Sequence, residues 1–332
     1  MINETFPKTQ LEFEERFSTD EACYEYLASV RWPDGFVCPD CGHHGGRRRP
    51  GREEFVCGSK ACKKKTSLRS GTVLHNSPKP LKAWIWAMFL MTTNKQSISA
   101  LRLQQLTGFG CYRTALRWLR ELRRAMSTVV EKQVMGLEVE VDETFVGHGK
   151  QKLQPNRPKT QVRIAGVVER LESGCGRARL KVITGEDKHE SIQNFVRATI
   201  KPGAFIHSDG LAAYEAMADE GFLGDARAVS GKKGAARLEN DTPKVLVHLP
   251  LIHRVFSLVM RVLIGAHQGA CSAQHLQGYL DEYCFRLQHQ KCGMPILPKS
   301  LWQMRTRWSL RLLASLHRQS RSINRTTRLT FS

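Results

Sequence analysis

Four cysteines in two pairs have the spacing of metal ligands. Cys38 and Cys41 are separated by two residues. After fifteen intervening residues come Cys57 and Cys62, which have four residues between them. Two thiolate pairs on short glycine-containing turns can place four sulfurs around Zn²⁺, which stabilises a segment too small to have a core. The pattern is typical of a structural zinc ribbon. Unligated thiols are the alternative, and His43 and His44 are less favoured substitute ligands.

Two aspartates stand at the ends of expected strands, where a carboxylate is available for chemistry. Residues 137–147 read LEVEVDETFVG, so apolar and acidic residues alternate with the period of a half-buried strand that ends at Asp142 on its polar face. A second strand, over 204–209, ends at Asp209. An ordinary solvated acid is the alternative interpretation of Asp142 taken by itself.

The charge of the chain points to a polyanionic partner. Lys and Arg number 51 against 31 Asp and Glu, which gives a net charge of +20 over 332 residues. The excess is clustered, with eleven basic and two acidic residues in 43–82 and eight basic residues and no acid in 293–332. A stripe of positive charge can follow a phosphate backbone, so double-stranded DNA is the expected partner.

The cellular setting is expected to be the cytoplasm, with the protein on the nucleoid when it is bound to DNA. The start of the sequence has no charged segment followed by an apolar one, so we expect the ten cysteines to stay reduced. The most apolar window, 245–265, contains His248, His253, Arg254 and Arg261, which argues against a membrane span.

A helix-turn-helix is expected between the cysteines and the first aspartate. Residues 71–80 read as a linker with a short strand, and 81–91 as a helix that is apolar on nearly all sides. A short helix with Ile98, Leu101, Leu103 and Leu106, a glycine turn at 107–110 and a basic helix complete the unit. The basic helix carries Arg113, Arg117, Arg120, Arg123 and Arg124. A helical connector with a solvated basic face is the alternative to a DNA-reading motif.

The remainder of the chain has an α/β pattern. A helix capped by Ser18, Thr19 or Asp20 is expected to bury Cys23. Strands over 162–168 and 180–183, with turns at 174–176, can pair with the strand that carries Asp142 as an antiparallel meander. Helices are expected over 191–200, over 252–264 and after Ser272.

These motifs, in this order, resemble the bacterial insertion-sequence transposases related to the Merlin group. The resemblance rests on the zinc ribbon, the apolar helix, VDETFVG at 141–147, SDG at 208–210, HRVFS at 253–257 and YLDEYCFR at 279–286. It implies an RNase H-like catalytic domain of the DDE kind, whose three metal-binding side chains hold two divalent ions. Asp142 and Asp209 match the first two positions. Paired ions of this kind can activate the attacking oxygen and stabilise the leaving oxygen in phosphoryl transfer.

The third position departs from the usual family pattern. Alignment on Phe256 and Ser257 puts His253 where most members have Glu. A neutral imidazole can still bind Mg²⁺ or Mn²⁺, and it favours the softer Mn²⁺. The basic residue usually found seven positions later falls on Met260, so Arg261 is assigned the phosphate contact instead. Glu239 and Asp241 are alternative sources of a third carboxylate, whereas Glu143, on the other strand face, is interpreted as structural.

The sequence therefore predicts an α/β transposase that binds the terminal inverted repeats of its element, cleaves its ends and joins them to target DNA. The expected domains are an N-terminal helix and zinc ribbon (1–76), the helical DNA-binding segment (77–132), the RNase H-like domain (133–292) and a basic tail (293–332). Bringing two ends together calls for a homo-oligomer. The alternatives are a catalytically inactive transposase that only binds DNA and a metal-dependent nuclease that cuts without joining.

Overall fold

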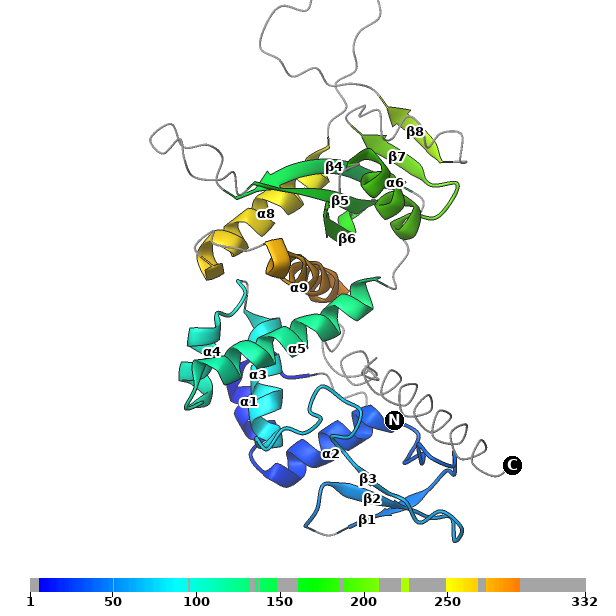
Figure 1. Cartoon of the computed structure of the whole chain (residues 1–332), viewed down its shortest axis with the longest axis vertical. Coiled ribbons are helices and arrows are strands. Elements are labelled where there is room, and N and C mark those ends of the chain that lie inside the picture. Colours follow the sequence, from blue (N-terminus) through cyan, green and yellow to red (C-terminus); the bar gives the residue numbers. More distant parts are fainter. Residues whose placement is uncertain are drawn as a thin grey trace, which may run out of the picture. The chain divides into compact units, whose positions relative to one another are not determined.

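The computed structural model describes residues 6–49, 51–94, 96–131, 135–136, 138–147, 161–184, 188–208, 222–226, 249–267 and 273–292. They divide into two compact units (Figure 1). The first takes its described residues from Met1–Thr93 and Leu103–Ala125, and the second from Asn94–Arg102 and Met126–Met294. Each unit is described by itself below. Of the predicted features, Asp209, Glu239, Asp241, Ser272 and the basic tail lie outside the described residues.

Two capped helices begin the first unit. Helix α1, Gln10–Arg16, starts with a capping box between Thr9 and Glu12, and α2, Asp20–Arg31, is capped by the Thr19 hydroxyl, which accepts the Ala22 N–H at 3.1 Å. The predicted helix with buried Cys23 is confirmed as α2, in which Cys23 is fully buried. Helix α1 was not predicted, although its capping box is visible in the sequence.

Helix α3, Leu81–Thr93, is buried on several sides, as its apolar sequence predicts. Aromatic rings from the N-terminal segment pack against it: the Phe13 ring lies 4.7 Å from Trp86 and 5.1 Å from Phe89. On α5, Tyr112–Glu131, the Trp118 ring stacks on Trp84 with 3.6 Å between centroids. These aromatic contacts join α1, α3 and α5 around one core.

The segment between the ribbon and α3 contains turns and no strand, so the expected short strand in 71–80 is wrong. The segment is nevertheless ordered, because Leu68 and Leu74 are fully buried. Arg69 forms an ion pair with Glu53 and donates to the carbonyls of Ser77 and Lys79. Because the Arg69 side chain binds two carbonyls eight and ten residues further along the chain, it fixes the path of this segment into α3.

The predicted helix, turn and basic helix are present as α4, Ala100–Thr107, and α5. Gly108 at the turn has a φ of +66°, a left-handed conformation that favours glycine. Leu103 is buried as expected, but Leu101 is 56% exposed. The buried face of α4 therefore contains fewer of the predicted apolar residues than expected.

The second unit is built on a five-stranded sheet with the order β6-β5-β4-β7-β8. Strands β4, Glu138–Val146, β5, Val162–Leu171, and β6, Gly174–Val182, form the predicted antiparallel meander. Strands β7, Phe205–Ser208, and β8, Leu223–Ala226, continue the sheet parallel to β4. Strand β8 was not predicted. Strand β4 runs four residues beyond Asp142, so the expectation that Asp142 ends its strand is wrong.

Helices cover both faces of this sheet (Figure 1). On one face, α6, Lys188–Thr199, buries Ile192, Phe195 and Val196 against Val139 and Val141 of β4. On the other, α8, Pro250–His267, packs on the central strands and α9, Ala273–Cys292, on β6. Gln277 fixes α9 to the sheet, because its side chain accepts the Val182 N–H and donates to the Leu180 carbonyl. No helix in the described part of the chain has the length and apolar content to span a membrane.

Candidate active site and zinc centre

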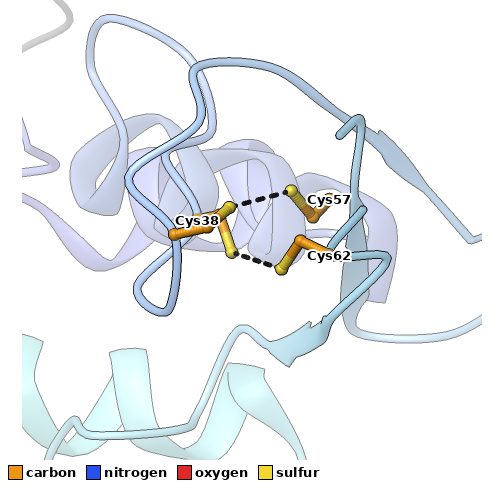
Figure 2. Close-up of side chains that lie close together, drawn as sticks. Cys38, Cys57 and Cys62 are labelled. Atoms are coloured by element: carbon orange, nitrogen blue, oxygen red, sulfur yellow. Dashed lines mark hydrogen bonds between the residues drawn. The ribbon is translucent and has the colours of Figure 1, made fainter. Parts of the chain in front are cut away.

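The four predicted cysteines converge in the first unit, and Figure 2 labels Cys38, Cys57 and Cys62 of this group. A small antiparallel sheet of β1, Gly46–Arg48, β2, Glu54–Cys57, and β3, Lys65–Ser67, supports them. All four sulfurs lie within 4.8 Å of one another, with 3.8 Å from Cys38 to Cys62 and 3.6 Å from Cys41 to Cys57. Sulfurs about 2.3 Å from a tetrahedral Zn²⁺ lie about 3.8 Å apart, so the donor set fits zinc.

The surroundings of these sulfurs act on their pKa values in opposite directions, because burial raises the pKa of the Cys57 thiol while hydrogen bonds lower that of Cys38. The pKa of the Cys38 thiol is lowered to about 7, mainly because the backbone N–H of Cys41 donates a hydrogen bond to its sulfur. Behind the sulfurs, Trp32, Phe36 and Phe55 form a compact aromatic group, with the last two rings stacked at 5.0 Å. Three rings are a small core, so a metal is expected to supply much of the ribbon's stability.

The second site lies on the face of β4 that carries Glu138, Glu140 and Asp142. Strand alternation turns these acids to one side, as predicted, and α8 packs on that side. His253, in the first turn of α8, places its Nε2 3.0 Å from Oδ2 of Asp142. Oδ1 of the same carboxylate accepts the backbone N–H of Glu143 at 2.7 Å. Two predicted site residues that are 111 positions apart in sequence are thus in direct contact.

This pair has the donors and the exposure that a divalent ion needs. The side chain of His253 is 61% exposed and that of Asp142 is 13% exposed. Neighbouring ligands about 2.1 Å from an octahedral ion lie about 3.0 Å apart, which matches the separation of the two donor atoms. The two atoms lie at hydrogen-bonding distance in this structure, and a carboxylate oxygen and an imidazole nitrogen at that separation also fit a shared divalent ion.

Glu140 is fully buried, although strand alternation had placed it on a polar face. Its Oε2 accepts the backbone N–H groups of Leu251 and Ile252, each at 2.9 Å. Its Oε1 lies 3.5 Å from Nη1 of Arg170. Sequence reasoning missed this residue. The available signal was the start of α8, where Leu249 and Pro250 offer no side-chain cap to the amides that follow.

A chain of charged groups continues from Glu140 along the same face. Arg170 also lies 3.3 Å from Glu138, whose Oε1 is 2.8 Å from Nε2 of His207 on β7. On the opposite face, away from Asp142, Glu143 forms a 2.8 Å ion pair with Arg163 on the neighbouring strand. Glu138 and Glu140 thus share one network through Arg170, while Glu143 on the other face belongs to another.

The predicted DNA-contacting arginines lie on the exposed sides of two helices. On α5, Arg113, Arg117, Arg120 and Arg124 are exposed at intervals of four, three and four residues, so they follow one face of the helix. Arg123 is buried and does not belong to that face. On α8, Arg261 is exposed, and its Nε donates to the Ser257 carbonyl at 3.5 Å.

The sheet of five strands with helices on both faces, and the ribbon with four converging cysteines, define an RNase H-like protein that carries a zinc ribbon. Comparison with protein families agrees. The transposase zinc-ribbon domain matches residues 18–65, and the ISXO2-like transposase domain matches residues 133–288. The chain therefore carries a transposase zinc ribbon followed by a transposase domain, which confirms the predicted resemblance to insertion-sequence transposases. No curated protein was found to match the sequence.

Proposed function

We propose that this transposase binds the terminal inverted repeats of its insertion sequence, hydrolyses the phosphodiester at each end and joins the freed 3′ hydroxyl to target DNA. Asp142, Asp209 and His253 would hold the catalytic divalent metals. The observation that supports this assignment is the 3.0 Å separation between His253 Nε2 and Asp142 Oδ2, in a pair whose imidazole is exposed and whose carboxylate is partly buried. For Asp209 the support is its position in the sequence, directly after β7, a strand that pairs with β4.

The chain's own residues would prepare the site before DNA arrives. The Glu143 N–H holds one oxygen of Asp142 and leaves the other directed at His253. When bound, Mg²⁺ or Mn²⁺ would stabilise charge on the attacking and leaving oxygens of the phosphoryl transfer. An imidazole nitrogen in place of a third carboxylate is a softer donor than oxygen, which favours Mn²⁺ over Mg²⁺.

DNA would be held mainly through its phosphates. The exposed arginine face of α5, the zinc ribbon and the basic tail are the proposed contacts, and Arg261 would bind a phosphate near the cut end. Contacts of this kind release counterions, so end binding should weaken steeply as salt rises. Because transposition joins two ends, we propose that a dimer or higher homo-oligomer acts on paired ends.

A strand-transfer assay tests this function. It uses the full-length protein, labelled DNA carrying the repeats that flank its gene, a plasmid target, and Mg²⁺ or Mn²⁺. The expected result is a joined product that needs the metal and is absent with Asp142→Ala, while end binding by that variant is unchanged. Glu172→Ala, in the exposed turn between β5 and β6, is the matched control and should keep full activity. End binding without cleavage in either metal would overturn the catalytic assignment.

A further inference from the structure

The start of α8 lacks the usual means of satisfying its own backbone. Its first residue, Pro250, has no N–H, and the first amide bonded within the helix is that of His253, which donates to the Leu249 carbonyl at 3.2 Å. Two first-turn amides remain, those of Leu251 and Ile252. Leu249 has no side-chain acceptor with which to cap them.

Both remaining amides donate to one oxygen of Glu140 on β4. The two N–H to Oε2 distances are 2.9 Å each, and the carboxylate is fully buried. The acceptor carries a negative charge and lies at the positive end of the helix dipole, so both bonds are charge-assisted. Glu140 therefore acts as an N-cap supplied from a different element, 111 residues before Leu251 in the sequence.

The position of this cap relative to the metal-binding pair is the decisive feature. Glu140 and Asp142 are two residues apart and share one face of β4, while Ile252 and His253 are consecutive on α8. The first acid holds the amide of Ile252, and the second contacts the side chain of the next residue, His253. Two acids of one strand thus hold the first turn of α8: Glu140 through its backbone and Asp142 through a side chain. Together they fix its distance from the sheet and its orientation about the helix axis.

We infer that Glu140 is a positioning residue that sets the separation of His253 from Asp142 and thereby the metal affinity of the site. Arg170 supports it from the opposite side, because its Nη1 lies 3.5 Å from the second Glu140 oxygen. The inference deepens the proposed function and rests on it. Partners that orient metal ligands typically contribute about 10- to 100-fold in metal affinity or activity, which is the effect expected of Glu140.

The test compares Glu140→Ala and Glu140→Gln with a matched control, Glu169→Gln. Glu169 is also a buried strand acid that accepts backbone N–H groups, from Gly136 and Arg177, and pairs with an arginine, but its contacts do not include α8. Hydrogen exchange of peptides covering 249–256 reports the cap without any metal. Mn²⁺ binding, followed by electron paramagnetic resonance on the zinc-loaded protein, reports the site.

In Glu140→Ala, the peptides covering 249–256 are expected to exchange faster, and Mn²⁺ affinity to fall about 10- to 100-fold. Glu140→Gln keeps a carbonyl oxygen that can accept both amides, so it should recover part of each effect. It also carries the test if the alanine variant does not fold. Glu169→Gln should lower thermal stability and leave both readouts at wild-type values.

The outcomes separate this inference from the proposed function. Faster exchange at 249–256 with unchanged Mn²⁺ affinity would overturn the positioning role and leave Glu140 as a structural cap. Unchanged exchange would overturn the cap itself. If Mn²⁺ binding by the wild-type protein does not depend on Asp142, the proposed function is overturned. The inference about Glu140 then falls as well, because it rests on that function.

Discussion

Asp142 on β4 lies opposite Gly166 on β5, and the missing side chain of Gly166 makes room for α8. A Cβ at Gly166 would come within 2.7 Å of Ile252 and 2.9 Å of Phe256, one residue before and three residues after His253. The pairing of β4 with β5 therefore brings the carboxylate to the point where the sheet allows α8 its closest approach.

Gly166→Ala is expected to move α8 away from the sheet and to separate His253 from Asp142. Overpacking of this kind costs about 1–3 kcal/mol, and a misplaced ligand should slow end cleavage about 100-fold. Thermal unfolding and cleavage rates check the two effects. Gly176→Ala is the matched control, because its Cβ would meet Glu169 at 2.8 Å and crowd the same sheet at a different place. If both variants slow cleavage equally, the close approach of α8 has no special role.

Removal of zinc is expected to unfold the ribbon and abolish end binding. The ribbon's own aromatic group consists of Trp32, Phe36 and Phe55, too few residues to hold the fold without a metal. Cys38→Ser should therefore lose bound zinc and change the tryptophan fluorescence. Cys111→Ser, at an exposed cysteine outside the metal cluster, should retain both. Zinc content and end binding, measured on the same samples, check this. A Cys38→Ser protein that binds ends normally would contradict it.

Glu169 should make the second unit sensitive to acid. Burial raises the pKa of this carboxyl, but hydrogen bonds from Arg177 and the Gly136 N–H outweigh burial and leave the pKa below its ordinary 4.5. A lowered pKa in the folded state means that the stability contribution is complete above about pH 4.5 and is lost as the pH falls through the folded pKa. The difference in urea midpoint between wild type and Glu169→Gln should shrink on going from about pH 7 to pH 3. A constant difference would count against the ion pair as its source.

Much of this fold follows from local sequence patterns. The meander of β4, β5 and β6 is predicted because apolar and polar residues alternate in β4 and two further strand-like segments follow with glycine turns at 174–176, and the cysteine spacing predicts the ribbon. The end of β4 was misjudged because the polar run after Val141 resembles a loop. In the structure that run stays in the strand, since Glu143 pairs with Arg163 on the neighbouring strand.

Tertiary contacts decide the features that the sequence does not reveal. Alternation predicts a solvated Glu140, but α8 covers it and uses it as a cap. Residues 71–80 look like a linker in the sequence. The side chain that orders them is Arg69, which lies before the segment, and no sequence pattern indicates that it binds their carbonyls. The contact between Asp142 and His253 was predicted only through family resemblance, because nothing local joins residues so far apart.

The arginine face of α5 should dominate the salt dependence of end binding. Arg113, Arg117, Arg120 and Arg124 lie along one exposed side of the helix. If Arg117 contacts a phosphate, Arg117→Ala should reduce the slope of log K against log salt by about one and weaken binding to specific and non-specific DNA alike. Arg197→Ala, on the exposed side of α6, is the control and should leave the slope unchanged. Loss of affinity for the repeats alone would indicate a base contact instead.

His253→Glu is expected to change the metal preference of the reaction. A third carboxylate supplies a hard oxygen donor in place of nitrogen, which favours Mg²⁺ over the softer Mn²⁺. The side chain is 61% exposed at its place beside Asp142, so the substitution requires little repacking of α8. Cleavage rates in Mg²⁺ and Mn²⁺, expressed as a ratio, should shift toward Mg²⁺ relative to wild type, whereas His253→Ala should lose activity in both metals. An alanine variant that cleaves as fast as wild type would show that His253 is not a ligand and that the third ligand must be sought elsewhere in the chain.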